Sequence, residues 1–125
     1  MIRVLVVDDE DTIRDSLVEI LAENGYAVTG ATDGRDALRK LRAAPGAFKL
    51  VLLDLTMPVM DGRAFREAQR RDATLASIPV IVLSAFRDVA VMAADLAAVA
   101  YLKKPLNVPA LLELLGAHIG PGAPS

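Results

Sequence analysis

Side chains able to do chemistry stand directly after short apolar runs in this 125-residue chain, and they are Asp8, Asp9, Asp54, Ser84 and Lys104. Carboxylates that converge raise one another's pKa and resist joint ionisation, a conflict that a hard divalent cation such as Mg²⁺ removes. A carboxylate can also attack phosphorus and form an aspartyl phosphate, while a metal ion and a lysine balance the charge of the phosphoryl oxygens. No histidine or cysteine stands nearby to favour zinc. These residue types therefore point to Mg²⁺-dependent phosphoryl transfer.

The hydrophobic pattern predicts the elements that must position these side chains. Apolar runs predict strands at residues 2–7, 26–29, 50–53, 79–83 and 101–102. Helical spacing and end signals predict helices over 12–23, from 33–34 to about 45, after 61–62, over 88–98, and from the cap Asn107 to about 119. Five strands alternating with five helices indicate an α/β fold, a three-layer doubly wound sandwich around a parallel sheet. Ligands of such sheets bind at the carboxyl ends of the strands, where the five polar residues stand.

The basic residues are interpreted as solvated helix faces rather than as a binding patch. On the helix after residues 61–62, the apolar spacing predicts inward-facing Ala64, Phe65 and Ala68 and outward-facing Arg63, Arg66 and Arg70. The row Arg35, Arg39 and Arg42 receives the same interpretation. Lys103 is expected to be exposed, because strand alternation points it away from Lys104.

Composition limits the class of protein. Hydrophobic residues make up 54% of the chain, which is enough for a core, and the net charge of −2 calls for neither nucleic acid nor an anionic membrane. No stretch approaches the ~18 apolar residues of a membrane span, and the N-terminus turns acidic too early for a signal peptide. The absence of cysteine excludes disulfides and thiolate metal sites. We expect a cytoplasmic protein with one domain over residues 1–119 and a flexible tail over 120–125.

Four segments together resemble the receiver domain of bacterial two-component response regulators: VLVVDDE (residues 4–10), LLDLTMPVMDG (52–62), VIVLSA (80–85) and YLKKP (101–105). The resemblance spans essentially the whole chain and is closest in kind to single-domain chemotaxis regulators. It implies a flavodoxin-like sheet with strand order 2-1-3-4-5, which puts strands one and three side by side.

The resemblance also implies residue roles. Asp54 matches the phospho-acceptor, Asp9 a direct Mg²⁺ ligand, and Asp8 an acid that helps to hold the metal, while Mn²⁺ could substitute. The backbone carbonyl of Thr56 would be a further ligand. Ser84 and Lys104 match the hydroxyl and lysine that contact the phosphoryl group. Two further roles concern Tyr101, which matches the aromatic switch residue, and the Lys104–Pro105 peptide, which should be cis.

The sequence departs from the family pattern near the usual signalling surface. The segment from Ser84 to Lys104 is a residue or two short, and Ala97-Ala98-Val99 replaces a Gly-Ala-Asp sequence. This region is unusually apolar for a signalling surface, because it contains Val91, Met92, Leu96 and Val99. Phe86, like Thr56, stands where the family tunes the lifetime of the phosphoryl group, and we expect its bulk to restrict attacking water.

The predicted function is a signalling switch or phosphorelay intermediate rather than a turnover enzyme. A sensor histidine kinase or a histidine phosphotransfer protein would donate the phosphoryl group, and a downstream protein would bind the face of helix 4, strand 5 and helix 5. No output domain is expected after residue 125. The alternatives are a phosphohydrolase, which would need a general acid where Leu55 and Thr56 stand, and a docking protein that is never phosphorylated. Residues 8–11 could merely cap a helix, and His118 is expected to be a surface residue rather than a phosphodonor.

Overall fold

A single parallel sheet forms the centre of the molecule. The computed structural model describes residues 2–55 and 61–122. Across this part of the chain the strands are β1 (Arg3–Val7), β2 (Ala27–Ala31), β3 (Phe48–Asp54), β4 (Val80–Ser84) and β5 (Ala100–Lys103). Their order is β2-β1-β3-β4-β5, and each neighbouring pair is parallel. The predicted fold class and strand order are therefore confirmed.

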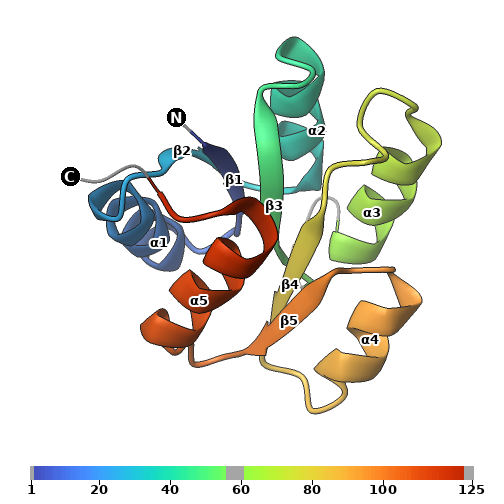
Figure 1. Ribbon diagram of the computed structural model, residues 1–125. Helices are drawn as coiled ribbons and strands as arrows, with labels where there is room; N and C mark the ends of the chain where they lie inside the picture. The colour runs from blue at the N-terminus through green and yellow to red at the C-terminus, as the bar shows by residue number, and fades with distance from the viewer. Residues whose placement is uncertain (1, 56–60, 123–125) are drawn as a thin grey trace.

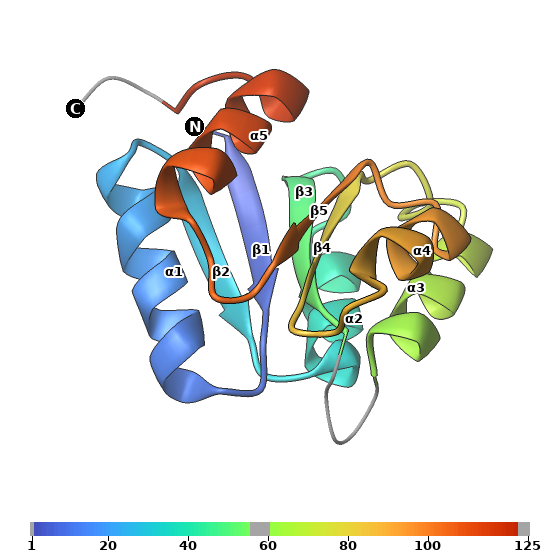
Figure 2. The ribbon, with the colours of Figure 1, turned by 90° about the horizontal axis from the view of Figure 1, so that it is seen from below.

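Helices cover both faces of this sheet. Helices α1 (Asp11–Glu23) and α5 (Val108–Ile119) lie on one face. Helices α2 (Gly34–Ala43), α3 (Gly62–Arg71) and α4 (Val89–Asp95) lie on the other. Both ribbon views show this three-layer arrangement, with the sheet between the two groups of helices (Figures 1 and 2). Parallel strands joined by helical crossovers require this cover, because both sheet faces are apolar.

Strand alternation divides the core into two clusters. On β1, Val4 and Val6 pack with Leu17 of α1 and Leu111 of α5, whereas Leu5 belongs to the cluster on the opposite face. All three β1 side chains are fully buried. Burial of a Val or Leu side chain contributes about 1.5–3 kcal/mol, so the central strands must be apolar on both faces. This requirement explains the apolar runs of the sequence. Polar side chains can stand at the ends of these strands, which the helices do not cover.

Short polar side chains fix where three helices begin. Asp33, Asp61 and Asn107 each accept a hydrogen bond from the backbone N–H three residues later, at the N-termini of α2, α3 and α5. Such caps contribute about 1 kcal/mol each. The Asn107 cap is the one that the sequence predicts, and it confirms where α5 begins.

Helix α4 is shorter than predicted. It ends at Asp95, and the chain then turns through Ala97, whose φ of 55° makes it the one non-glycine with positive φ in residues 2–55 and 61–122. The Ala97 and Ala98 N–H groups donate to the carbonyls of Ala94 and Ala93, which closes the helix end. A left-handed residue at this place is usually glycine, and alanine is strained there by about 1 kcal/mol.

A buried polar link joins α3 to the end of α4, and it corrects two predictions. Arg66 is only 6% exposed rather than solvated, and Ala64 is exposed rather than inward. The Arg66 guanidinium donates to the carbonyls of Leu96 (2.8 Å) and Ala97 (3.1 Å) and to the side-chain oxygen of Gln69 (2.9 Å). The Gln69 amide donates onward to two further carbonyls, those of Leu75 and Ile78. Burial and, to a smaller degree, Arg70 lower the pKa of Arg66.

The first residues after α5 lie against the turn between α1 and β2. The Tyr26 hydroxyl donates to the Gly120 carbonyl at 2.9 Å. Burial raises the pKa of Tyr26, and a hydrogen bond to the backbone of Gly122 partly offsets this effect. None of the helices in the described ranges has the length and apolarity needed to cross a membrane.

Candidate functional site

Three carboxylates meet at the carboxyl ends of β1 and β3. These strands are neighbours, with Val7 paired to Leu53, so the residues that follow in each strand are adjacent. One carboxylate oxygen each of Asp8, Asp9 and Asp54 lies within 4.8 Å of the other two. Asp8 and Asp54 are 1% and 5% exposed, whereas Asp9 is exposed to solvent. The topology therefore creates one open-sided acidic cluster.

Lys104 brings a positive charge to this cluster. Its Nζ lies 3.3 Å from Asp8 Oδ2 and 3.6 Å from Asp54 Oδ1. Its backbone N–H donates to the Ser84 carbonyl at 2.8 Å, and the Lys104–Pro105 peptide is cis. Lys103 points outward and is exposed, as strand alternation predicts. One lysine offsets only part of the negative charge of three ionised carboxylates.

Ser84 ends β4, the strand next to β3 in the sheet. It is buried, and its Oγ accepts a hydrogen bond from the Phe86 N–H at 3.0 Å. The β3–β4 register pairs Asp54 with Leu83, so Ser84 stands one residue beyond that pair. This placement puts the hydroxyl at the carboxyl ends of the strands, where the three carboxylates also lie.

Exposed apolar side chains lie around the β4–α4 loop, α4 and β5. Tyr101 and Phe86 are each 46% exposed, and Val91 and Val99 are also exposed. The sequence-based description of this surface is partly wrong, because Leu96 is buried in the core and Met92 packs partly buried against it. Met92 lies on the inward face of α4, and Leu96, the residue at its C-cap, packs into the core.

The loop between β1 and α1 is held by hydrogen bonds to Asp8. The Asp8 N–H donates to the Ala31 carbonyl, and Asp8 Oδ1 accepts from the Glu10 N–H at 3.0 Å. The Asp8 carbonyl accepts from Arg14 Nη1 at 2.9 Å. Glu10, the residue at the N-cap position of α1, makes no side-chain capping bond. A side-chain cap from Glu10 therefore does not explain its place in this run of acids, whereas Asp11 lies in the first turn of α1, where the helix dipole favours an acid.

Helix α3 begins in contact with the backbone that carries Asp54. The Gly62 N–H donates to the Leu55 carbonyl at 3.1 Å. A Cβ at Gly62 would lie 3.0 Å from the Asp54 carbonyl oxygen and 2.7 Å from Leu55 Cα, and the second distance is shorter than real Cβ atoms show. Glycine is therefore required here by the close approach of two backbones. Thr56, Met57 and Met60, which the sequence placed around the site, lie outside the described residues.

The donor atoms of the acidic cluster suit a hard divalent cation. All of them are carboxylate oxygens, and the side chains of Asp8 and Asp54 are buried. The single charge of Lys104 does not balance the three carboxylates. Mg²⁺ takes one or two carboxylates, keeps several waters and shares its remaining positions with phosphate oxygens. The exposed side of Asp9 leaves room for such ligands. The residues present therefore fit a Mg²⁺ ion.

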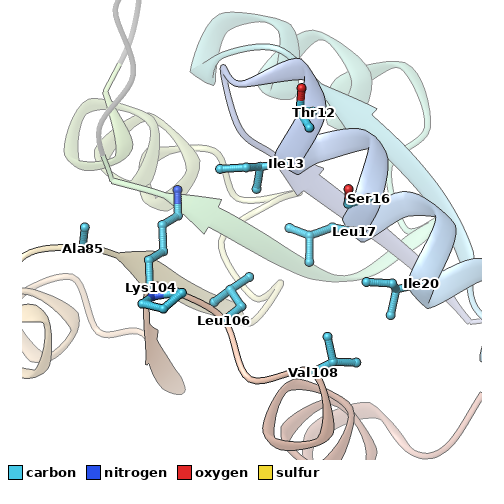
Figure 3. A pocket seen from close by; sticks show the side chains of 10 residues that line it. Thr12, Ile13, Ser16, Leu17, Ile20, Ala85, Lys104, Leu106 and Val108 are labelled. Atoms are coloured by element: carbon cyan, nitrogen blue, oxygen red, sulfur yellow. The ribbon is translucent and has the colours of Figure 1, made fainter.

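An apolar groove of about 550 Å³ opens beside the cluster. Figure 3 shows Ile13, Leu17 and Ile20 of α1 along one side, and Leu106 and Val108 along the other. Lys104 lines the same groove, so its side chain belongs to both the groove and the acidic cluster.

Two arginines whose side chains donate to backbone carbonyls, Arg14 and Arg66, are not among the predicted site or core residues. The apolar pattern of α3 places Arg66 on the solvent side of the helix. The one sequence signal against this is Gln69, which stands three residues later and so lies on the same helix face as Arg66. Arg14 stands one turn into α1, whose first residue is the last acid of the run over residues 8–11, and a cation beside such a run is a signal that could have been used.

Residues 4–116 match the response regulator receiver domain family. Two curated relatives are similar over most of this chain. The transcriptional regulatory protein PdtaR of Mycobacterium tuberculosis is 38% identical over 116 residues, which cover 90% of this chain and 54% of that protein. The response regulator MprA of Mycolicibacterium vanbaalenii is 39% identical over 119 residues, covering 93% and 49%. The chain thus spans about half the length of these relatives.

Solved structures show the same fold. The chemotaxis protein CheY4 of Vibrio cholerae superposes with a TM-score of 0.85 at 33% identity, covering 95% of this chain and 99% of that one. The response regulator TrrA of Thermotoga maritima, solved in complex with Mg²⁺ and BeF, gives a TM-score of 0.83 at 34% identity, covering 95% and 100%.

Proposed function

The chain belongs to the response regulator receiver domain family, and from this membership we propose that Asp54 accepts a phosphoryl group from phosphohistidine of a partner protein. The observation that carries the proposal is the position of the Asp54 carboxylate. It lies 3.6 Å from the Lys104 amine and within 4.8 Å of two further carboxylates at the edge of the sheet. The partner would be a sensor histidine kinase or a histidine phosphotransfer protein.

The proposed transfer forms one bond and breaks one. A carboxylate oxygen of Asp54 attacks phosphorus, the P–N bond of phosphohistidine breaks, and its electron pair stays on the imidazole nitrogen. The product is an aspartyl phosphate. The Lys104 amine and the Ser84 hydroxyl donate hydrogen bonds to the phosphoryl oxygens, where negative charge is spread in the loose transition state. Water later hydrolyses the acyl phosphate, so the chain promotes its own phosphorylation and dephosphorylation without turning over an external substrate.

The proposed metal is Mg²⁺, for which Mn²⁺ could substitute. Asp8, Asp9, Asp54 and the backbone carbonyl of Thr56 would hold it, and TrrA with its Mg²⁺ and BeF supports this assignment. The bound ion would neutralise charge on the carboxylates and on the incoming phosphoryl oxygens.

The phosphodonor is proposed to dock in the apolar groove. The groove is continuous with the acidic cluster through Lys104, and its apolar lining from α1 suits the apolar stripe of a partner helix. A helix seated there would bring a histidine side chain to the open side of Asp9 and Asp54.

The proposed output is a population shift at the β4–α4 loop and β5. Bonds from Ser84 and Lys104 to the phosphoryl group would favour one arrangement of this region, with Tyr101 changing its exposure. A downstream protein would then bind the surface of α4, β5 and α5, where Val91, Val99 and Tyr101 are exposed. Aromatic and apolar side chains of this kind are common anchors of protein interfaces.

Mass spectrometry of the intact protein tests this function directly. Incubation with acetyl phosphate and Mg²⁺ should add the mass of one phosphoryl group, and a chelator in excess of Mg²⁺ should prevent it. A chain that gains no mass under the first condition, with its fold verified by circular dichroism, would be a docking protein instead.

Replacing Phe86 with alanine should shorten the lifetime of the aspartyl phosphate. Phe86 follows the buried Ser84, and its half-exposed ring would restrict the approach of water to phosphorus. We expect decay about fivefold faster, which is a barrier change of about 1 kcal/mol. The measurement is loss of the phosphoryl mass with time after the donor is removed. Val91→Ala, at an exposed site on α4, is the matched control, and equal decay of all three proteins would contradict this role.

A further inference from the structure

We propose that Arg14 is a positioning residue for the metal site, because it fixes the peptide that leads from Asp8 into Asp9. The inference rests on the proposed Mg²⁺-dependent function and deepens it. Arg14 Nη1 donates to the Asp8 carbonyl at 2.9 Å, and Nη2 forms an ion pair with the exposed Asp11. Arg14 thus spans the loop that carries two of the three carboxylates.

The bond to the Asp8 carbonyl controls how Asp9 is presented. The peptide unit is planar, so fixing the Asp8 carbonyl also fixes the N–H and Cα of Asp9. Asp9 is exposed, and its carboxylate therefore depends on its backbone for orientation. Asp8 itself is held elsewhere, by Glu10 N–H and Lys104 at its side chain. Loss of Arg14 would free the peptide while leaving the Asp8 carboxylate in place.

The fold makes room for the Arg14 side chain. That side chain is only 13% exposed and lies across Gly30 of β2. A Cβ at Gly30 would lie 3.1 Å from Arg14 Cδ, tighter than ordinary contact. An alanine at this position would require the Arg14 side chain to shift by a few tenths of an ångström, which we expect to lengthen its bond to the loop. This contact supplies a way to displace Arg14 without changing the charge of the protein.

The positioning role and simple electrostatics predict opposite signs. A cation near a Mg²⁺ site repels the ion, so removing the charge of Arg14 should tighten binding if Coulomb repulsion dominates. If Arg14 positions Asp9, removing it should weaken binding. Loss of a residue that orients metal ligands costs at least about tenfold in affinity, and we expect about tenfold for Arg14→Met.

Calorimetric titration of the full, unphosphorylated chain with MgCl₂ tests the proposal. Arg14→Met should weaken Mg²⁺ binding about tenfold, and Gly30→Ala should weaken it at unchanged charge. Arg14→Lys, which keeps one donor, should fall between Arg14→Met and wild type. Asp11→Asn, which removes only the exposed partner of Arg14, should stay within about twofold. Thermal unfolding without Mg²⁺ shows that each variant is folded.

Unchanged or tighter binding by folded Arg14→Met would overturn the positioning role, and so would unchanged binding by Gly30→Ala. These results leave the proposed function intact, because wild type still binds Mg²⁺. Failure of wild type to bind Mg²⁺ would instead overturn the proposed function together with this inference.

Discussion

Asp54→Asn should abolish uptake of a phosphoryl group from acetyl phosphate and should also make the metal-free protein more stable. The amide has nearly the same shape as the carboxylate but no nucleophilic oxygen. It also removes one of three clustered negative charges, at the cost of one ion pair with Lys104. Loss of the repulsion from Asp8 and Asp9 should outweigh loss of the Lys104 ion pair, so we expect the free energy of unfolding to rise by about 1–2 kcal/mol. Intact mass gives the first result, and urea unfolding without Mg²⁺ gives the second.

The matched control is Asp15→Asn, which neutralises an exposed acid on α1. It should accept one phosphoryl group as wild type does and should unfold within about 0.5 kcal/mol of wild type. Added Mg²⁺ should stabilise wild type and Asp15→Asn more than Asp54→Asn, because the last has lost a ligand. Phosphorylation of Asp54→Asn to the wild-type level would show that another residue is the acceptor.

Arg66→Met should lower the free energy of unfolding by about 3 kcal/mol, because it leaves buried acceptors without donors. Arg66 donates to the carbonyls of Leu96 and Ala97 and to Gln69. Each buried acceptor left unpaired costs about 1–3 kcal/mol, while methionine recovers part of the loss by avoiding desolvation of the guanidinium. Urea unfolding followed by circular dichroism measures the change.

Arg63→Met is the control for this prediction, since Arg63 is exposed on the same helix. Its free energy of unfolding should lie within about 0.5 kcal/mol of wild type. Equal stability of Arg66→Met and wild type would mean that the cost of burying the guanidinium cancels its three hydrogen bonds.

The fold could be predicted from the sequence because burial on both faces leaves a strong pattern. Residues such as Val4, Leu5 and Val6 must all be apolar in a covered parallel strand, and the helices between the strands carry their own spacing and caps. The length of α4 could not be predicted in this way. Its end depends on Ala97 taking a left-handed conformation that tertiary contacts support, and alanine gives no local signal for it.

The acidic cluster could be predicted because the C-terminal ends of neighbouring parallel strands lie at the same end of a sheet. Asp8, Asp54 and Lys104 lie together because β1, β3 and β5 end at one edge of the sheet. Arg66 and Gln69 escaped prediction because a helical pattern assigns long polar side chains to solvent. Their burial depends on backbone carbonyls from distant turns, and no spacing along α3 reveals those acceptors.

The contact between Gly62 and the backbone of Asp54 and Leu55 offers a second route, besides Ser84 and Lys104, by which a change at Asp54 could reach α4. The backbone at the start of α3 lies directly against the backbone of Asp54 and Leu55, so a displacement of one should be transmitted to the other. One turn further along α3, Arg66 donates hydrogen bonds to the carbonyls of Leu96 and Ala97, which directly follow α4. A movement of Asp54 should therefore reach the C-terminal end of α4 through α3, and hydrogen exchange at the Leu96 amide would report it.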